Sequence, residues 1–337
     1  MKWKVYNRKG FPINNNVALS YIFRVGGPKP PLGWLCIRAG TDGEGAAIGV
    51  GTSHCLMDGI GTAQFLNSFA DLASGRREPD DFQPKPVWDR HLLDPTQLSL
   101  HTRNLEFNLI SDISGIFSTF DSETMSPTSV VFDKTRLTKL KKLASSTCQH
   151  SELPFSFTSF EVLTAHVWRS WARSLDFPSE QILRMLFSVN IRNRLKPSLP
   201  EGYYGNGFVL TCAQANVKDL SDKDLGHAAS LIRNAKDNVG DEYVRSLIQA
   251  ISKSRLTTDS VGLLMVSQWS RFGLEKVDFG MGKPVHVGPI CRDRYCLFLP
   301  VYEQSDSVMV TVAVPNSAVA KYEFLLSSPC STSCCHY

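Results

Sequence analysis

Hydrophobic and polar residues follow two patterns that alternate along this chain. Short apolar runs between polar or glycine-containing stretches predict strands; they lie at 34–38, 46–51, 129–132, 183–189, 207–213, 263–269, 296–302 and 308–314. Stretches in which apolar residues return every three or four positions predict amphipathic helices; they lie at 62–72, 133–145, 158–175, 222–238, 242–254 and 317–326. Strands and helices mixed in this way predict a protein of α/β layers.

Two stretches lack these patterns and predict connections. The first 30 residues hold only a short apolar run, 17–25, among asparagines, glycines and prolines, and we interpret them as the edge of a domain. Residues 76–127 are polar and rich in proline, which predicts a long crossover between two lobes.

Composition narrows the classes of function. The chain has 337 residues, of which 42% are hydrophobic and 20% charged, as in an ordinary globular protein. Its net charge of +4 is small, and its Lys and Arg residues are scattered, so nucleic acid is not an expected partner. No apolar run reaches the roughly 18 residues of a membrane span, and the start lacks the apolar segment of a signal peptide. We therefore expect a cytoplasmic protein.

Nine cysteines, an odd number, are spread without the regular spacing of a disulfide framework, which favours reduced thiols. They are Cys36, Cys55, Cys148, Cys212, Cys291, Cys296, Cys330, Cys334 and Cys335. The three at the C-terminal end are compatible with a metal site or a lipid anchor, and equally with a solvated terminus.

The clearest candidate chemistry lies in Ser53-His54-Cys55-Leu56-Met57-Asp58-Gly59-Ile60-Gly61. His54 follows a predicted buried strand and precedes a turn at 58–61, after which Thr62 is placed to cap a helix. A histidine at such a junction is held by the scaffold on one side and faces a cleft on the other. Because its ordinary pKa is about 6.5, it suits a general base near neutrality.

Other interpretations of His54 are weaker on the sequence. A metal site requires a third ligand beside His54 and Asp58, and none of His91, His101 and His286 has a neighbour that supplies one. A serine hydrolase would carry a Gly-x-Ser-x-Gly elbow, which is absent from the sequence. A purely structural histidine remains the plainest alternative, although the surrounding glycines weaken it.

Two later segments are also distinctive. In Val277-Asp278-Phe279-Gly280-Met281-Gly282-Lys283-Pro284, the glycines and proline predict a loop, which Asp278 can fix through backbone N–H groups. Asp-Phe-Gly also occurs in protein kinases, but the other kinase motifs are missing from the chain. Arg192 follows a predicted strand and is either solvated or paired with a carboxylate such as Asp58.

Taken together, these segments resemble the plant BAHD family of acyl-CoA-dependent acyltransferases, over residues 31–328. His54-Cys55-Leu56-Met57-Asp58-Gly59 matches the family's His-x-x-x-Asp-Gly, and Asp278-Phe279-Gly280-Met281-Gly282 matches Asp-Phe-Gly-Trp-Gly except for Met281. Tyr203-Tyr204-Gly205-Asn206 and the helix with Ser159-Phe160-Glu161 and His166-Val167-Trp168-Arg169 are similar to further family segments. Peptide-synthetase condensation domains and chloramphenicol acetyltransferases share His-x-x-x-Asp, so the specificity comes from the motifs in order.

The resemblance implies an α/β, two-lobe chloramphenicol-acetyltransferase-like fold with mixed sheets. It implies an N-terminal lobe at 1–85, completed by about 277–298, a crossover at 86–128 and a C-terminal lobe at 129–337. In the family, the histidine takes the acceptor's proton, which gives His54 the role of base. The aspartate points away and binds an arginine, so Asp58, with Gly59, and Arg192 would support the loop. Asp278, with Gly280 and Gly282, would shape the second loop.

The partners that the resemblance implies are acyl-CoA as co-substrate and a small-molecule alcohol or amine. No permanent cofactor or metal is implied, and Ser159 matches a position that contacts CoA in relatives. The acyl group is expected to be aromatic or hydroxycinnamoyl, the acceptor a specialised metabolite, and the enzyme a monomer.

The chain departs from the family in two ways. Met281 replaces an indole with a flexible thioether, which we expect to tune the substrate channel. Only 53 residues precede His54, where the family has roughly a hundred more, an estimate consistent with two-lobe sizes. We therefore expect an incomplete first lobe, arising from a truncated gene model, a splice form or a degraded copy. The alternative to an enzyme is then a non-catalytic remnant that binds acyl-CoA or a partner chain.

Overall fold

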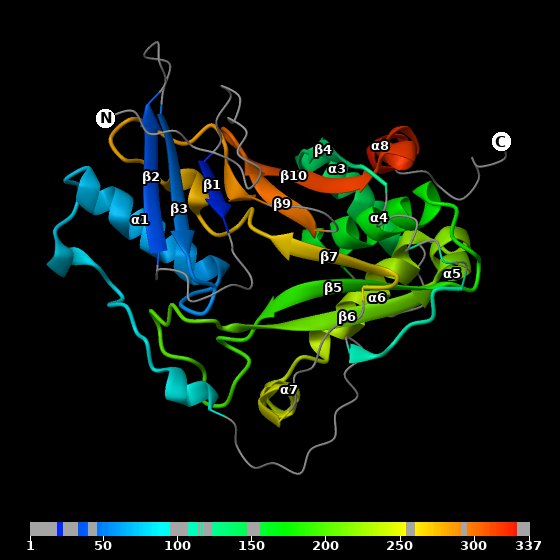
Figure 1. Ribbon diagram of the computed structural model, residues 1–337, viewed down its shortest axis with the longest axis horizontal. Coiled ribbons are helices and arrows are strands. Elements are labelled where there is room, and N and C mark those ends of the chain that lie inside the picture. The colour runs from blue at the N-terminus through cyan, green and yellow to red at the C-terminus, as the bar shows by residue number, and fades with distance from the viewer. Residues whose placement is uncertain are drawn as a thin grey trace.

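The computed structural model describes residues 19–22, 33–39, 46–94, 107–113, 115, 117, 123–146, 156–253, 260–290 and 295–328. Its strands form two sheets, one of four strands in the order β2-β3-β1-β8 and one of six in the order β4-β10-β9-β7-β5-β6 (Figure 1). The smaller sheet contains β1 (Leu19–Ile22), β2 (Gly33–Ala39), β3 (Ala46–Thr52) and β8 (Val287–Ile290). The larger contains β4 (Met125–Phe132), β5 (Ile182–Asn190), β6 (Phe208–Asn216), β7 (Leu263–Gln268), β9 (Tyr295–Val301) and β10 (Gln304–Pro315).

The smaller sheet joins segments from opposite ends of the chain. β1 runs parallel to both β3 and β8, and β2 pairs antiparallel with β3. Helix α1 (Gly59–Ala73) contributes Ala63, Leu66 and Ala70 to a shared core with strand residues such as Ile48 and Val287. Since β1 has partners on both sides, our interpretation of the first 30 residues as an edge is wrong for 19–22. That pairing with β8 depends on residues far away in sequence.

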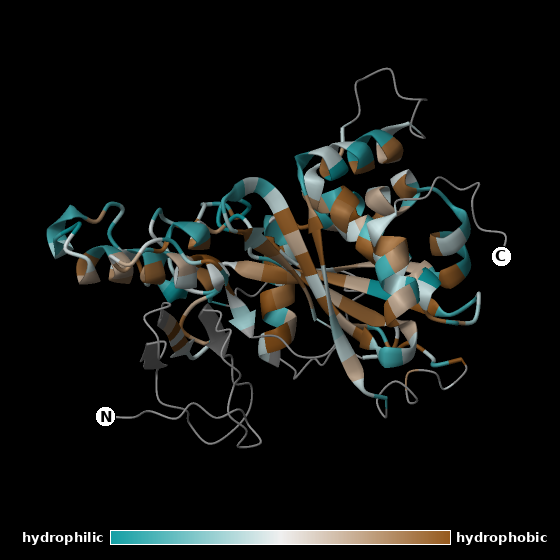
Figure 2. Ribbon diagram, turned by 90° about the horizontal axis from the view of Figure 1, so that it is seen from above, coloured by the Kyte–Doolittle hydropathy of each residue, from teal (hydrophilic) through white to brown (hydrophobic). Residues whose placement is uncertain are grey.

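The larger sheet is mixed and carries the main core. β4, β10 and β9 are antiparallel, β9, β7 and β5 are parallel, and β6 is antiparallel to β5. Hydrophobic residues concentrate where its strands meet the helices, whereas the outer turns are hydrophilic (Figure 2). The remaining helices are α3 (Lys134–Ser145), α4 (Ser159–Ser174), α5 (Val217–Asp222), α6 (Leu225–Asp237), α7 (Asp241–Lys253) and α8 (Val319–Ser327), with short 3₁₀ turns at Pro79–Asp81, Arg90–Leu93, Leu274–Lys276 and Asn316–Ala318.

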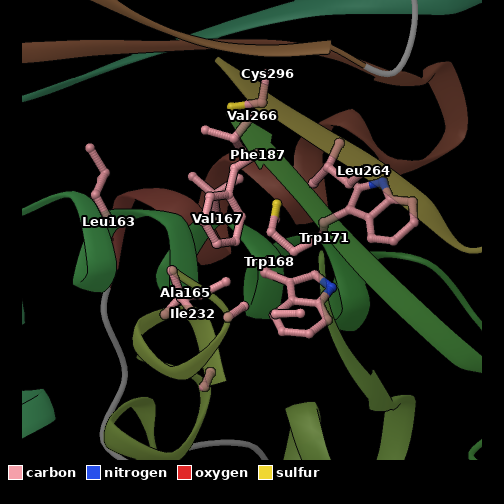
Figure 3. Close-up of a cluster of buried hydrophobic side chains, with 14 of the residues drawn as sticks. Leu163, Ala165, Val167, Trp168, Trp171, Phe187, Ile232, Leu264, Val266 and Cys296 are labelled. Atoms are coloured by element: carbon pink, nitrogen blue, oxygen red, sulfur yellow. The ribbon is translucent and has the colours of Figure 1, made fainter. Parts of the chain in front are cut away.

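Helix α4 lies at the centre of the helical layer. It contacts α3, α5, α6 and α8, and its residues Trp168 and Trp171 pack near Phe187 of the sheet (Figure 3). Thr158 and Glu161 form a reciprocal capping box at its start. The Glu161 carboxylate is fully buried and binds Arg233 at 2.8 Å and also Lys236, so its charge is compensated.

Several element boundaries differ from the sequence prediction. Helix α1 begins at Gly59 and is capped by Asp58, whose carboxylate accepts from Gly61 N–H, so the prediction of Thr62 as the cap is wrong. The helix expected at 222–238 begins at Leu225, because Asp224 caps it, and α5 precedes it as a separate turn. Strand β4 begins at Met125, before the expected residue 129. None of the helices in the described ranges is long and apolar enough to cross a bilayer.

Candidate active site

His54 lies in a tight turn between β3 and α1, where its side chain is exposed. The turn closes through a 2.9 Å hydrogen bond from Leu56 N–H to the Ser53 carbonyl. The His54 ring lies 5.9 Å from the ring of Phe208, which begins β6. Asn206, just before β6, donates from Nδ2 to the His54 carbonyl at 2.8 Å. The larger sheet therefore contacts both the ring and the backbone of His54.

Asp58 is buried and fully engaged as an acceptor. Arg192 reaches both of its oxygens, with Nη1 to Oδ2 at 2.9 Å and Nη2 to Oδ1 at 3.0 Å. Gly61 N–H donates to Oδ1 and Gly207 N–H to Oδ2, each at 2.9 Å. These four bonds use the roughly four acceptor positions of a carboxylate. Asp58 is thus built to hold the start of α1, and the sequence alternative in which Arg192 is merely solvated does not describe this site.

Arg192 extends this connection to the segment before β6. Its guanidinium also donates to the carbonyl of Gly205 at 2.9 Å and, through Nε, to that of Tyr203 at 3.1 Å. Gly61 must be glycine for a related reason, because a Cβ there would lie 2.0 Å from the Tyr204 carbonyl oxygen. The start of α1 and residues 203–207 therefore pack with backbone against backbone.

Asp278 shapes its own loop. Its Oδ1 accepts from Gly280 N–H at 2.8 Å and Gly282 N–H at 2.9 Å, and both glycines have positive φ, 88° and 97°. The bond from Gly280, followed by that from Gly282 and the charge of Arg76, lowers the pKa of Asp278. Arg76 also donates to the Asp278 carbonyl. Met281 is 67% exposed in this loop.

The two motif loops lie at opposite ends of α1. Asp58 caps the first residue of the helix, whereas the Asp278 loop is attached through Arg76, just beyond the last. Fifteen residues of α-helix span about 22 Å. The structure therefore does not bring the Asp278 carboxylate to His54.

Ser159, the first residue of α4, lines an open cavity of about 230 Å³. Three basic side chains share its lining with Ser270: Lys134 and Lys141, both on α3, and Arg271, 130 positions after Lys141. Lys134 also pairs at 3.2 Å with Asp306, which lines the same cavity. From the sequence only Ser159 was expected here, because nothing local indicates that Arg271 meets the lysines of α3.

The described His, Cys, Asp and Glu side chains bear on metal and thiol chemistry. Among the described residues, no group of three or more His, Cys, Asp or Glu side chains is arranged to hold a metal ion. Cys55 is exposed and Cys212 and Cys296 are buried, and none of these three described thiols forms a disulfide. The side chains of the other six cysteines, including the C-terminal three, lie outside the described residues.

Comparison with known proteins decides the family. The model of the Transferase family matches residues 37–325. The chain belongs to this family, the BAHD acyltransferases. It is 35% identical over 285 residues to an omega-hydroxypalmitate O-feruloyl transferase of Arabidopsis thaliana, covering 83% of this chain and 61% of that protein. It is 30% identical to a fatty alcohol:caffeoyl-CoA acyltransferase of the same plant, covering 84% and 64%. The chain thus spans less than two thirds of the length of these relatives.

Solved structures show the same fold. The chain superposes on Fusarium graminearum TRI101 complexed with coenzyme A and deoxynivalenol with a TM-score of 0.70 at 18% identity, covering 86% of this chain and 67% of that one. For vinorine synthase the TM-score is 0.63 at 20% identity, covering 88% and 66%. The predicted α/β, chloramphenicol-acetyltransferase-like fold with mixed sheets is confirmed.

Proposed function

We propose that this chain transfers an acyl group from a CoA thioester to a hydroxyl or amine, with His54 as the general base. One observation carries the proposal: the backbone around His54 is fixed from several sides, through Asp58, Arg192 and Asn206, while the imidazole remains exposed. A fixed loop with an exposed base at its tip suits proton transfer from a bound nucleophile, which contributes about 10²–10⁴-fold in rate.

In the proposed reaction, His54 removes the proton as the acceptor's oxygen or nitrogen attacks the thioester carbonyl. The tetrahedral intermediate then collapses, the carbon–sulfur bond breaks, and the proton passes from His54 to the leaving CoA thiolate. Asp58, Gly59 and Arg192 support the loop, and Asp278, Gly280 and Gly282 support the loop at the other end of α1.

The donor and acceptor classes rest on the relatives. Two of them are named for feruloyl and caffeoyl transfer to hydroxylated fatty chains. Another, from Taxus canadensis and 28% identical, is named an N-benzoyltransferase. We propose an aromatic, hydroxycinnamoyl-type donor and an alcohol or amine acceptor from specialised metabolism.

The cavity at Ser159 is the proposed site for the anionic part of CoA. Lys141 and Arg271 supply positive charge, Lys134 shares its charge with Asp306 on the same lining, and the Ser159 and Ser270 hydroxyls supply hydrogen bonds, which together suit phosphate groups. No permanent cofactor is proposed.

We further propose the division expected from the sequence, with 1–85 and about 277–298 as one lobe, 86–128 as the crossover and 129–337 as the other lobe. The pairing of β1 with β8 supports the inclusion of the later segment in the first lobe. The working form is proposed to be a cytoplasmic monomer.

CoA release from a panel of acyl-CoAs, with alcohols and amines as acceptors, tests the reaction. His54→Ala should lower turnover at least about a hundredfold, whereas His227→Gln, on α6, should leave it unchanged. Undiminished turnover in His54→Ala would remove His54 from the mechanism. The alternative is a non-catalytic remnant that binds acyl-CoA or a partner chain. Turnover by the purified chain would exclude it.

The cavity has a test of its own. Lys141→Ala and Arg271→Ala should raise KM for acyl-CoA with little change in kcat, because they remove binding that is uniform through the reaction. Lys139→Ala is the matched control, since Lys139 lies on the same helix and is exposed outside the cavity. An unchanged KM in both cavity variants would contradict the CoA site.

A further inference from the structure

The segment after α1 returns to the loop that carries His54. Residue 87 forms an isolated parallel bridge with Tyr203, in which Val87 N–H donates to the Gly202 carbonyl at 2.9 Å and Tyr204 N–H donates to the Val87 carbonyl at 3.2 Å. These bonds fix the start of the crossover against residues 202–204, the segment that Arg192 also holds.

Arg90, three residues further on, is oriented by aromatic rings. Its guanidinium carbon lies 3.6 Å from the centroid of the Trp88 ring, and Trp88 in turn stacks on Tyr204 with centroids 4.9 Å apart and planes 29° from parallel. A stacked guanidinium is held in plane with its N–H groups directed outward, which a lysine ammonium cannot reproduce.

The Arg90 guanidinium binds the backbone of the turn that carries His54. Arg90 Nη2 donates to the carbonyl of Cys55 and, at 3.3 Å, to that of Leu56. The preceding carbonyl, of His54, accepts from Asn206. Three successive carbonyls of the turn therefore accept hydrogen bonds from side chains that lie 34 to 152 positions away in the sequence.

We propose that Arg90, backed by Trp88, is a positioning residue that sets the direction in which His54 presents its imidazole. The inference rests on the proposed function of His54. A peptide whose carbonyls are fixed on one side has little freedom to rotate, and the φ/ψ angles of residues 54–56 determine where the His54 side chain points. Removal of the Arg90 bonds frees this rotation, and a misplacement of about 1 Å in a reacting group costs as much as a hundredfold in rate.

Arg90→Met tests this role, because methionine keeps an unbranched apolar stem against Trp88 and removes both donors. Arg90→Lys keeps the charge and loses the planar fork. Arg77→Met is the matched control: Arg77 also lies over an aromatic ring, that of Phe82 at 5.8 Å, and its ion pair is with Asp71, away from the His54 turn. For each variant, kcat and KM are measured together with hydrogen exchange of peptides that cover 53–58 and α4.

The expected result is a tenfold to hundredfold fall of kcat in Arg90→Met, with KM for acyl-CoA within about twofold of wild type. Amide exchange should rise in 53–58 and stay unchanged in α4, Arg90→Lys should recover part of kcat, and Arg77→Met should match wild type. An unchanged kcat, or unchanged exchange in 53–58, would overturn the proposal. If hydrogen exchange of α4 also rises in Arg90→Met, that variant has lost more than the bonds to the turn. The role of Arg90 is then judged from kcat and from exchange in 53–58 in Arg90→Lys.

These measurements distinguish a failure of the Arg90 role from a failure of the proposed acyl transfer. A wild-type chain without turnover would contradict the proposed function, and exchange in 53–58 alone would then decide whether Arg90 holds the turn. Turnover that is normal in wild type and in Arg90→Met would leave the function standing and overturn only the role of Arg90.

Discussion

Arg192 binds both carboxylate oxygens of Asp58, at 2.9 and 3.0 Å, although 134 positions separate the two residues in the sequence. The pair joins the start of α1, in the smaller sheet's half of the molecule, to the strands of the larger sheet. Both side chains are largely buried, with 5% of Asp58 and 12% of Arg192 exposed. The pair therefore behaves as an internal connection between the two halves.

Removal of the Asp58 charge should destabilise the protein strongly. Asp58→Asn leaves the Arg192 guanidinium buried without its counter-ion, which costs about 3–5 kcal/mol in the free energy of unfolding. Urea denaturation measures this quantity. Asp219→Asn, which breaks the more exposed pair with Lys223, should cost less than about 1 kcal/mol. Equal losses in the two variants would contradict the structural role of Asp58.

Gly61→Ala tests the contact between α1 and residues 203–205. The added methyl would meet the Tyr204 carbonyl, whose residue is itself bonded to Val87, so relief requires backbone movement. We expect a loss of about 1–3 kcal/mol, despite the better helix propensity of alanine. Gly240→Ala provides the comparison, because no atom lies within 4 Å of its new Cβ. Thermal denaturation of both variants should show a lower Tm only for Gly61→Ala.

Buried His166 should make stability depend on pH. Burial lowers its pKa to about 4, against the opposing effect of its 2.8 Å bond to the Leu326 carbonyl. The unfolded chain, with a histidine pKa near 6.5, therefore binds more protons between pH 6.5 and 4. Stability is complete above pH 6.5 and falls by up to about 3 kcal/mol toward pH 4. Urea denaturation across this range should show a shallower decline in His166→Gln, and parallel curves would refute the assignment.

Asp278→Ala should open its loop with a smaller effect on turnover than His54→Ala. Alanine removes the acceptor for Gly280 and Gly282 N–H, so limited proteolysis should cut faster within 278–284. The loop lies about 22 Å from the His54 end of α1, estimated from the length of the helix. A loss of turnover as large as that of His54→Ala would show that the two loops act together. Asp176→Ala, whose carboxylate is 95% exposed, is the control.

The sequence predicts an element correctly where the residues that determine it are neighbours in the chain. Helix α4 was expected at 158–175 and lies at Ser159–Ser174, because Thr158 and Glu161 form its capping box and apolar residues mark its faces. The α/β fold and the family also followed from motifs read in order. Position 58 shows the limit: the cap was expected at Thr62, whereas Asp58 caps the helix and is held by Arg192, 134 positions away in the sequence.

The parts that were missed depend on contacts between distant segments. β8 is a four-residue strand without a periodic pattern, and it exists through its pairing with β1. Arg90 and Asn206 are ordinary polar residues in their own segments, and their meeting at the His54 turn follows from the fold. The basic lining around Ser159 has the same origin, since Lys141 and Arg271 lie 130 positions apart in the sequence.

The pairing of β1 with β8 also has a consequence for biosynthesis. As the ribosome releases the chain, residues 19–22 emerge long before 287–290, so this interior strand waits for its partner through most of translation. Unpaired strand edges and exposed apolar surface invite wrong associations during such an interval. Helix α4 meets α3, α5 and α6 by about residue 237, whereas its contact with α8 also waits until the chain is nearly complete. Yield in cells should therefore depend on chaperones in part through the smaller sheet.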